Sequence, residues 1–582
     1  MRFRFFALCV LCFVSVALVS RCFFGQLAVG QPARLGVINV DTGLSYAGVQ
    51  EAINAVETLA GHEIRVGLGV FSESVVVNKS VSLVGDNRDT SVIDGIRGSA
   101  AVTVVSDGVE IRSLSIRNGV LGLLVDHADN CKIIDNVLYE GSYGLRLYHS
   151  RGSYVAGNRV SGFSWFGVEL DRSGNTTLRD NWLSQNQYGF GVDGGSLLDF
   201  LNDIGDSNRV NGKPIRYLVN QRDLIVDSST WSDVGYLGFV NSSNIVVKDL
   251  EVQNNVQGVL LAGVTDSSVT GVRVSHNWNG VYVAYSRNVS VYEVEATRNF
   301  DYGIKFFDSP SSRAFRNEVD SNGWAGIGLF GSSHSVLDLN EASFATYDLH
   351  LVHTNNSVVT RNTAIPKEGG YSIAVYYSHN NSIYHNTFQN SLLFAETRNG
   401  SSFTPTNNWN NSVEGNFWTA HNGHDADEDG VSDAAYRVGV NNFDYYPLMG
   451  RFWEFDLVLG DLEYRVSVIS NSTVSDVGFD DGTVVFVAVG QSGTIGFCRV
   501  AVPEALIRAL GDVELGFLVN GEEPSVVREW SDGATGYWYI QFVNRTPQDW
   551  SLLWLLVFGV LVFVIVLGVV IGVHRMRRKA KA

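Results

Sequence analysis

The chain has 582 residues and a formal net charge of −18. All 60 acidic residues lie between two hydrophobic ends, where 34 of the 42 basic residues accompany them and leave a net charge of −26. Such an acidic segment excludes an electrostatic surface for nucleic acid or anionic lipid. Only Cys131 and Cys498 lie outside the first 30 residues, far apart in sequence, which excludes a disulfide framework.

Residues 1–30 are expected to be a secretory signal peptide. Arg2 and Arg4 precede the apolar run FFALCVLCFVSVALVS, which is too short to span a bilayer comfortably. Cleavage is expected between Gly25 and Gln31, with a retained signal anchor as the alternative. Ten N-x-[ST] sequons fit an exported glycoprotein.

A short amphipathic helix is expected at VQEAINAV, which begins at Val49, because its apolar residues recur at helical spacing. Such a helix would cap the first coil of a solenoid, since an open coil exposes a strand edge that pairs with other chains. The coils are expected to begin near Ile64 and to continue to about residue 450.

A glycine repeat organises residues 38–450. Glycine precedes an apolar-x-apolar pair at steps of 22 or 23 residues, with one gap of 69, at Gly122, Gly144, Gly167, Gly189, Gly258, Gly280, Gly303 and Gly326. Gly212 and Gly235 are expected at the two missing places, and the register continues at Asp348 and Ser372. Units this short, with few helix formers, indicate short strands joined by turns.

A second repeat of asparagines, at steps of 22 to 24, comprises Asn136, Asn158 and Asn181, then Asn317, Asn340, Asn362 and Asn386. Inward asparagines stacked in this way can hydrogen-bond the coils above and below. The two repeats predict an all-β, right-handed parallel β-helix of 22- to 24-residue coils. A leucine-rich repeat is the alternative, although its leucine frame is missing. Residues 197–236 fit the register least well and predict an insertion.

The stretch HNGHDADEDGVSD, which begins at His421, predicts a calcium loop at residues 425–433. The expected ligands are Asp425, Asp427, Asp429 and Asp433, with the backbone carbonyl of Val431. Counted from Asp425, position twelve is Tyr436, so the bidentate glutamate of a helix-loop-helix sensor is missing. We expect a structural calcium clip that closes the solenoid, with a solvated acidic turn as the alternative.

Alternating stretches such as TVVFVAV predict a small β-sandwich at residues 453–546. The uncharged residues 551–573 are long enough for one transmembrane helix, and the basic tail 574–582 is expected in the cytoplasm. The chain is thus expected to be a single-pass cell-membrane protein whose ectodomain lies outside.

A family resemblance follows from several motifs in order, above all VNGKPIRYLVNQ and GNFWTAHNGHDADEDGVSDAAYRV. Over residues 38–450 the chain resembles archaeal surface proteins that carry the NosD-type copper-binding, carbohydrate-binding and hydrolase-like β-helix. The resemblance implies the fold, and it implies copper-site maturation or sugar binding as candidate activities.

Positions two and four after each repeat glycine are expected to point outward and form columns along one face. The first column contains Arg146, Glu169, Gly191, Leu260, Tyr282, Lys305, Gly328, His350 and Ala374, and the second contains Tyr148, Asp171, Asp193, Ala262, Ala284, Phe307, Phe330, Val352 and Tyr376. The candidate ligand-binding residues are Tyr282, Lys305, Phe307, Phe330 and His350, because aromatic rings beside polar groups suit sugar chains. The alternative is that these rings pack under a turn. The first column has one acid, Glu169, and no acidic cluster of the kind that a polysaccharide lyase uses.

The sequence argues against copper, because Met449 is the single methionine between the hydrophobic ends and the two cysteines are far apart. No nucleophile elbow, phosphate loop or HExxH motif occurs. The sequence therefore predicts a membrane-anchored extracellular scaffold that binds glycans or cell-envelope polymers. The alternatives are a carbohydrate-active lyase, hydrolase or epimerase, and a NosD-like accessory protein for metalloenzyme maturation. No catalytic residue is assigned.

Overall fold

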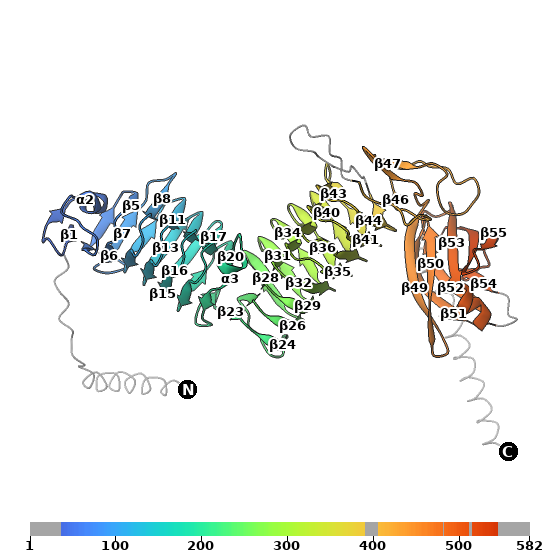
Figure 1. Cartoon of the computed structure of the whole chain (residues 1–582), viewed down its shortest axis with the longest axis horizontal. Helices are drawn as coiled ribbons and strands as arrows, with labels where there is room; N and C mark the ends of the chain where they lie inside the picture. Colours follow the sequence, from blue (N-terminus) through green and yellow to red (C-terminus); the bar gives the residue numbers. More distant parts are fainter. Residues whose placement is uncertain (1–35, 390–405, 481, 511–514, 545–582) are drawn as a thin grey trace, which may run out of the picture.

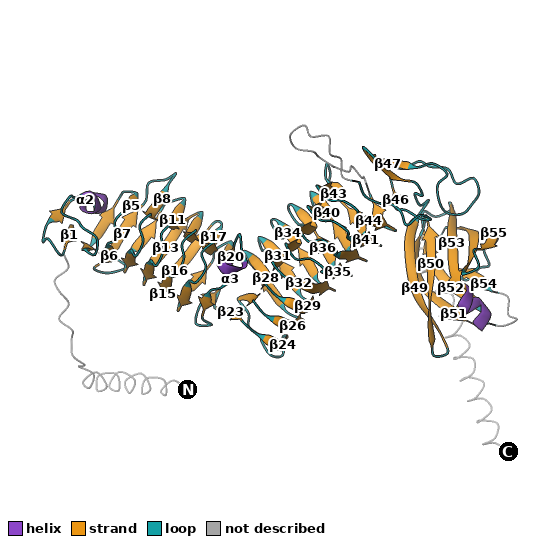
Figure 2. Ribbon diagram, viewed as in Figure 1, coloured by secondary structure: helices purple, strands orange, loops and turns teal. Residues whose placement is uncertain are grey.

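The computed structural model describes residues 36–389, 406–480, 482–510 and 515–544. The predicted signal peptide, transmembrane helix and basic tail lie outside these residues. Figure 2 shows strands in most of the described chain, with short helices at α2 (Val49–Asn54), α3 (Leu197–Phe200) and α4 (Glu504–Ala509). Among the described residues, no helix is both long enough and apolar enough to cross a membrane.

The solenoid has two arms that meet at an angle near α3 (Figure 1). Each arm is built from parallel sheets, and one sheet of each arm carries the glycine repeat. The first glycine sheet contains β5 (Val75–Val77), β8 (Ala100–Val104), β11 (Leu121–Asp126), β14 (Tyr143–Tyr148), β17 (Phe166–Asp171) and β20 (Tyr188–Asp193). The second glycine sheet contains β23 (Lys213–Val219), β25 (Tyr236–Val240), β28 (Gln257–Ala262), β31 (Asn279–Ala284), β34 (Tyr302–Phe307), β37 (Ala325–Phe330), β40 (Tyr347–Val352) and β43 (Tyr371–Tyr376).

The strand registers confirm the predicted parallel β-helix. In β34, Ile304 and Phe306 are fully buried, whereas Lys305 and Phe307 alternate with them and reach the outer face. Lys305 has Tyr282 and Gly328 as its partners on the neighbouring coils. The interior therefore repeats coil by coil, and a continuous apolar core fills each arm.

The predicted asparagine ladder is also confirmed. The buried Asn340 side chain donates to the Ala314 carbonyl at 2.9 Å and to the Asn362 side-chain oxygen at 2.8 Å. Its own oxygen accepts from the Asn317 side chain at 2.8 Å. Two further ladders were not predicted. A second asparagine ladder at the next turn includes Asn255, Asn277, Asn299 and Asn322. A serine ladder includes Ser286, Ser309 and Ser332.

The insertion at the junction breaks the repeat. After α3 come β21 (Asp203–Ile204) and β22 (Arg209–Val210), and β22 pairs with β23 in an antiparallel hairpin. Gly212 lies in this hairpin turn, with φ of 86°. Gly235 lies one residue before β25. Leu237 pairs with Val259, so the residue opposite the repeat glycine Gly258 is Tyr236 and not Gly235. The expectation that Gly212 and Gly235 fill the missing repeat places is wrong, because the hairpin reverses the chain.

The amphipathic helix α2 lies where its apolar spacing predicts. Val49, Ala52 and Ile53 are fully buried against the first coil. The carboxylate of Glu73 accepts hydrogen bonds from the backbone N–H groups of Val49 and Gln50, at 2.7 and 2.9 Å. These bonds satisfy two free donors at the start of the helix and fix it on the solenoid end.

A β unit of two sheets follows the solenoid. One sheet contains β49 (Arg451–Leu459), β50 (Leu462–Ser470), β53 (Ile495–Pro503), β55 (Ser525–Ser531) and β56 (Thr535–Val543), and the other contains β51 (Thr473–Asp480), β52 (Thr483–Val489) and β54 (Gly516–Val519). The two sheets share one apolar core. Arg499 of this unit pairs with Glu414 at 2.5 Å, and Phe452 stacks on His385 with ring centroids 3.7 Å apart. The β unit is thus bonded to the last coils.

Candidate functional site

The outer face of the second glycine sheet gathers aromatic rings around Lys305. Its ammonium lies 5.3, 5.0 and 5.6 Å from the ring centroids of Tyr282, Tyr302 and Phe330. These distances are within the range of cation–π attraction. A side chain at Gly328 would meet the Tyr302 ring at 2.7 Å and the Phe330 ring at 3.0 Å, so the glycine makes room for both rings.

His350 closes this group on the next coil. Its side chain is 5% exposed, and its Nδ1 atom lies 3.0 Å from the Tyr302 hydroxyl. Burial, reinforced by the positive charge of Lys305, lowers the pKa of His350 to about 4. The imidazole is therefore neutral at pH 7, and it stacks on Tyr347 with centroids 4.8 Å apart.

The structure brings the five predicted ligand-binding residues onto one face. Tyr282 is buried in an apolar core shared with the first arm, and His350 is buried as well, whereas Lys305, Phe307 and Phe330 are partly exposed. Phe307 and Phe330 are partners on adjacent strands, as expected. Their rings turn apart, because Phe307 packs on Tyr285 while Phe330 packs on Tyr302.

An acidic group lies on the first glycine sheet at the junction. Arg146 pairs with Glu169 at 2.9 Å and with Asp171 at 2.7 Å, and Asp171 is the strand partner of Asp193. Burial raises the pKa of Glu169 to about 7, although Arg146 opposes this shift. The Asp193 side chain is exposed, yet desolvation by the surrounding protein raises its pKa, and Lys305 partly offsets the effect.

Asp193 of the first arm and Lys305 of the second arm interact electrostatically across the junction. Burial raises the pKa of Tyr282 strongly, and the charge of Asp193 adds to the shift. The Tyr285 hydroxyl donates to the Gly194 carbonyl at 3.4 Å across the same junction. Glu169, Asp171 and Asp193 all belong to the predicted outward columns, but their spacing did not indicate that Asp193 interacts with Lys305 of the other arm.

A line of aromatic rings follows the turns that precede the glycine sheets, and sequence analysis missed it. Trp278 lies 5.2 Å from Trp165 of the first arm and 4.4 Å from Phe300 of the next coil, measured between ring centroids. Farther along, Trp324 contacts Tyr347 at 5.2 Å. We call Trp165, Trp278, Phe300 and Trp324 the aromatic line. The signal was present in the sequence, since each ring lies two or three residues before a repeat glycine.

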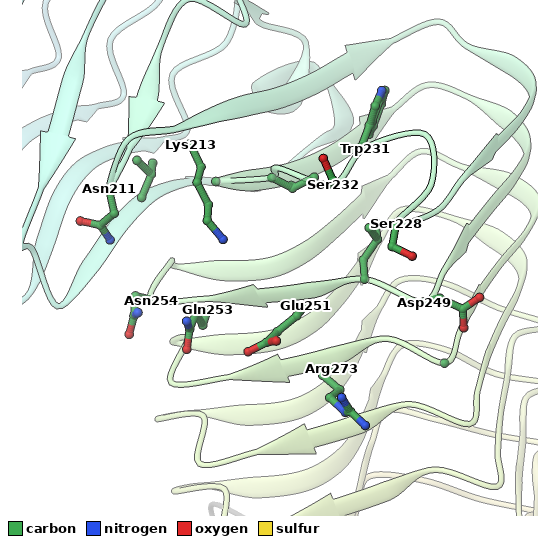
Figure 3. Close-up of a pocket in the computed structure, with 15 residues that line it drawn as sticks. Asn211, Lys213, Ser228, Trp231, Ser232, Asp249, Glu251, Gln253, Asn254 and Arg273 are labelled. Carbon is green, nitrogen blue, oxygen red and sulfur yellow. The ribbon is translucent and has the colours of Figure 1, made fainter.

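Two hollows open where the arms meet. The hairpin pocket, of about 590 Å³, lies between the β22–β23 hairpin and the first coils of the second arm, and Figure 3 shows Lys213 directed across it toward Gln253 and Glu251. The turn pocket, of about 770 Å³, lies beside the aromatic line. Asn211 and Asn254 line both hollows, and Asn211 and Lys213 belong to the NGKP motif.

The predicted calcium loop places ligand oxygens of Asp425, Asp427 and Asp429 within 4.8 Å of one another. Asp433 is not part of this close group, and its carboxylate accepts a hydrogen bond from the backbone N–H of Ala426 at 2.8 Å. The pKa values of Asp425 and Asp429 are raised, chiefly by burial. Arg528 of β55 pairs with Asp427 at 3.1 Å, so the loop lies against the β unit.

The two cysteines do not offer thiolate ligands for copper. Cys131 and Cys498 are fully buried in separate cores, and burial raises the pKa of their thiols to about 11 and 12. Both thiols are therefore protonated rather than available as thiolate ligands. Among the described residues, the cluster of three or more side chains that could hold a metal ion is formed by Asp425, Asp427 and Asp429. Their carboxylate oxygens are hard donors, which suit calcium.

Comparison with known proteins gives one family match. The family model described as periplasmic copper-binding protein (NosD) matches residues 69–197 and 218–423, which is more than half of the chain. The gap between these ranges coincides with the insertion at the junction. A cell surface glycoprotein of Methanothermus fervidus is 25% identical over 157 residues, which cover 25% of this chain and 26% of that relative. The chain thus matches about a quarter of that relative's length.

Solved structures with a similar course of the chain include β-helix enzymes. The DFA-IIIase of Arthrobacter chlorophenolicus is 13% identical, with a TM-score of 0.25 over 56% of this chain and 86% of that one. The mannuronan C-5 epimerase A-module of Azotobacter vinelandii is 12% identical, with a TM-score of 0.23 over 60% and 93% of the two chains. At such TM-scores these likenesses say nothing about activity.

Proposed function

This chain belongs to the NosD family, and we propose that it is a cell-surface β-helix protein that binds glycans or cell-envelope polymers. The proposed binding surface is the outer face of the second glycine sheet. The observation that carries the proposal is the group of partly exposed side chains on this face, Lys305, Phe307 and Phe330, with the Lys305 ammonium 5.6 Å from the Phe330 ring centroid. Rings beside a charged group hold sugars through their apolar faces, while polar groups bond the hydroxyls.

The proposal includes the expected topology. An exported ectodomain anchored by residues 551–573 would hold the solenoid outside the cell, with the basic tail 574–582 in the cytoplasm. The family name and the name of the archaeal relative both fit an envelope location. The charge of the segment between the hydrophobic ends fits a partner other than nucleic acid.

A glycan array with the full-length protein tests the binding surface. The exposed rings are removed in the double variant F307A/F330A, and the charge is removed in Lys305→Met. Both variants are expected to lose the array signals of the native protein. The matched control is Phe344→Ala, since Phe344 is an exposed ring at a turn outside this face. Unchanged array signals in both test variants would contradict the proposed surface.

A carbohydrate-active enzyme is the second candidate function, and the junction carboxylates favour it. Glu169, with a pKa of about 7, can hold a proton at neutral pH, while Asp193 stands opposite Lys305 on the other arm. Acidic groups in different environments are what general acid–base cleavage of glycosidic bonds requires. Incubation with acidic and neutral polysaccharides tests this candidate. New reducing ends that disappear in Asp193→Asn would establish it.

We also propose calcium as a structural ion at Asp425, Asp427, Asp429 and Asp433, with the Val431 carbonyl. The contact of Asp427 with Arg528 supports a role in fixing the β unit on the solenoid. Calcium is expected to raise the melting temperature and a chelator to lower it, with Asp429→Asn insensitive to both. An accessory role in metalloenzyme maturation would instead require copper, and a copper titration with no stoichiometric binding would exclude that role.

A further inference from the structure

The turn pocket lies where the two arms are hydrogen-bonded together. The backbone N–H of Gly189 in the first arm donates to the Asn254 carbonyl at 2.6 Å, and the Val256 N–H donates to the Phe190 carbonyl at 2.9 Å. Asn254 lines the pocket, so its floor is built from the junction itself. With a volume of about 770 Å³, the pocket is large enough for a sugar ring.

The charge of this pocket is opposite to that of the chain. Its described lining contains no carboxylate and includes Arg298 and His276, which lie on adjacent coils of the second arm. Both residues have left-handed backbone, with φ of 54° and 56°, at exposed turns. The Arg298 guanidinium is exposed and has no carboxylate beside it in this described lining. A guanidinium in such a place can bind the anionic group of a ligand.

The other lining groups suit a sugar rather than an inorganic ion. The side-chain oxygen of Asn211 accepts from the Gln185 N–H at 3.0 Å, which fixes the amide and leaves its N–H₂ group to donate. Phe300 is 48% exposed at the pocket wall, and Trp278 backs its ring at 4.4 Å. A supported, exposed ring is a platform for the apolar face of a pyranose.

We propose that the turn pocket binds an anionic sugar unit, one that carries a carboxylate or sulfate group. Arg298 contacts the anionic group, the amide of Asn211 donates to a ring hydroxyl, and Phe300 lies against the sugar face. The inference rests on the proposed glycan function and adds a second, charge-selective site away from the Lys305 face. The adjoining hairpin pocket carries Glu251 opposite Lys213, so its mixed charge does not select anions (Figure 3).

Calorimetric titration of the full-length protein with three trisaccharides tests this site. The probes are a galacturonic acid trisaccharide, a sulfated galactose trisaccharide and the matching neutral galactose trisaccharide. At least one anionic probe is expected to bind about tenfold or more tightly than the neutral probe, and added salt reduces the difference. The anionic probe that shows the preference identifies which group the pocket takes.

Variants assign the preference to Arg298. Arg298→Gln is expected to remove the preference, and Phe300→Ala is expected to weaken all three probes. The matched control is Arg287→Gln in β32 (Arg287–Tyr292), because Arg287 is an exposed arginine of the same arm on another sheet. Since Arg298 and Phe300 are exposed, both variants are expected to keep the melting temperature of the native protein.

Two results would overturn the proposal. One is an anionic preference that survives in Arg298→Gln, and the other is failure of both anionic probes to bind more tightly than the neutral one. Neither result touches the proposed surface around Lys305, which the array measurement with F307A/F330A tests separately. Loss of array binding in that double variant, together with no anionic preference, would leave the Lys305 face as the site and remove the turn pocket.

Discussion

Replacement of Asn340 by alanine tests whether the asparagine ladder stabilises the solenoid. Asn340 is fully buried, and its side-chain oxygen accepts from the backbone N–H of Asn317 at 3.2 Å and from the Asn317 side chain at 2.8 Å. Its amide donates to the Ala314 carbonyl and to Asn362. Asn340→Ala therefore leaves two buried N–H groups of Asn317 without these acceptors. At about 1 to 3 kcal/mol for each unsatisfied donor, the expected cost is about 2 to 6 kcal/mol.

Amide hydrogen exchange read by mass spectrometry measures this cost where it arises. Each coil contacts only its neighbours, so the loss is expected in peptides that contain β35 (Arg313–Phe315) and β38 (Val336–Asp338), not in the first arm. The expected loss of protection is about 30-fold or more. The control Glu341→Ala changes an exposed residue of the neighbouring strand β39 (Glu341–Ser343), and it is expected to alter stability by less than about 0.5 kcal/mol. Equal protection in the two variants would refute the role of the ladder.

Three further substitutions have expected outcomes. Burial raises the pKa of the Asp348 carboxyl to about 8. Between pH 4 and pH 8 this carboxyl is therefore ionised in the unfolded state but still protonated in the folded state. The stability of the fold falls as the pH rises through this range. Asp348→Asn should therefore stabilise the protein by several kcal/mol at pH 7 and by little at pH 4, as urea denaturation at the two pH values would show. Arg499 and His385 together hold the pKa of Glu414 at about 2, against the opposing effect of burial. Arg499→Met removes the buried arginine of this group and should cost about 3 to 5 kcal/mol, with the β unit melting separately in calorimetry. A single unchanged calorimetric transition would contradict that role. Gly328→Ala should displace the Tyr302 ring and the Phe330 ring, cost about 1 to 3 kcal/mol and weaken glycan binding. Native binding would show that the positions of these rings are unimportant.

Local repetition made the solenoid predictable. Because each coil packs on copies of itself, the apolar pair after a repeat glycine must point inward on every coil, as Ile304 and Phe306 do. The same logic predicts from the sequence alone that Lys305 lies beside Tyr282 and Phe330 beside Phe307, as they do. The asparagine spacing was equally informative, since a buried amide needs a partner on the next coil.

Repetition could not predict the junction. The insertion after β20 contains an antiparallel hairpin, which displaced Gly212 and Gly235 from the expected register. Its geometry depends on packing of α3 and the hairpin against coils of both arms. No spacing in the sequence shows that Asp193 comes to interact with Lys305.

The sequence by itself determined the repeating fold, the capping helix, the outward columns and the residues of the acidic loop, because each depends on contacts between neighbouring coils or within one short segment. Only the tertiary structure decided which outward residues are buried, as Tyr282 and His350 are, and which hollows form at the junction. The physical reason is that a single break in a solenoid turns one arm against the other. The break thereby creates contacts between residues whose separation bears no relation to the repeat.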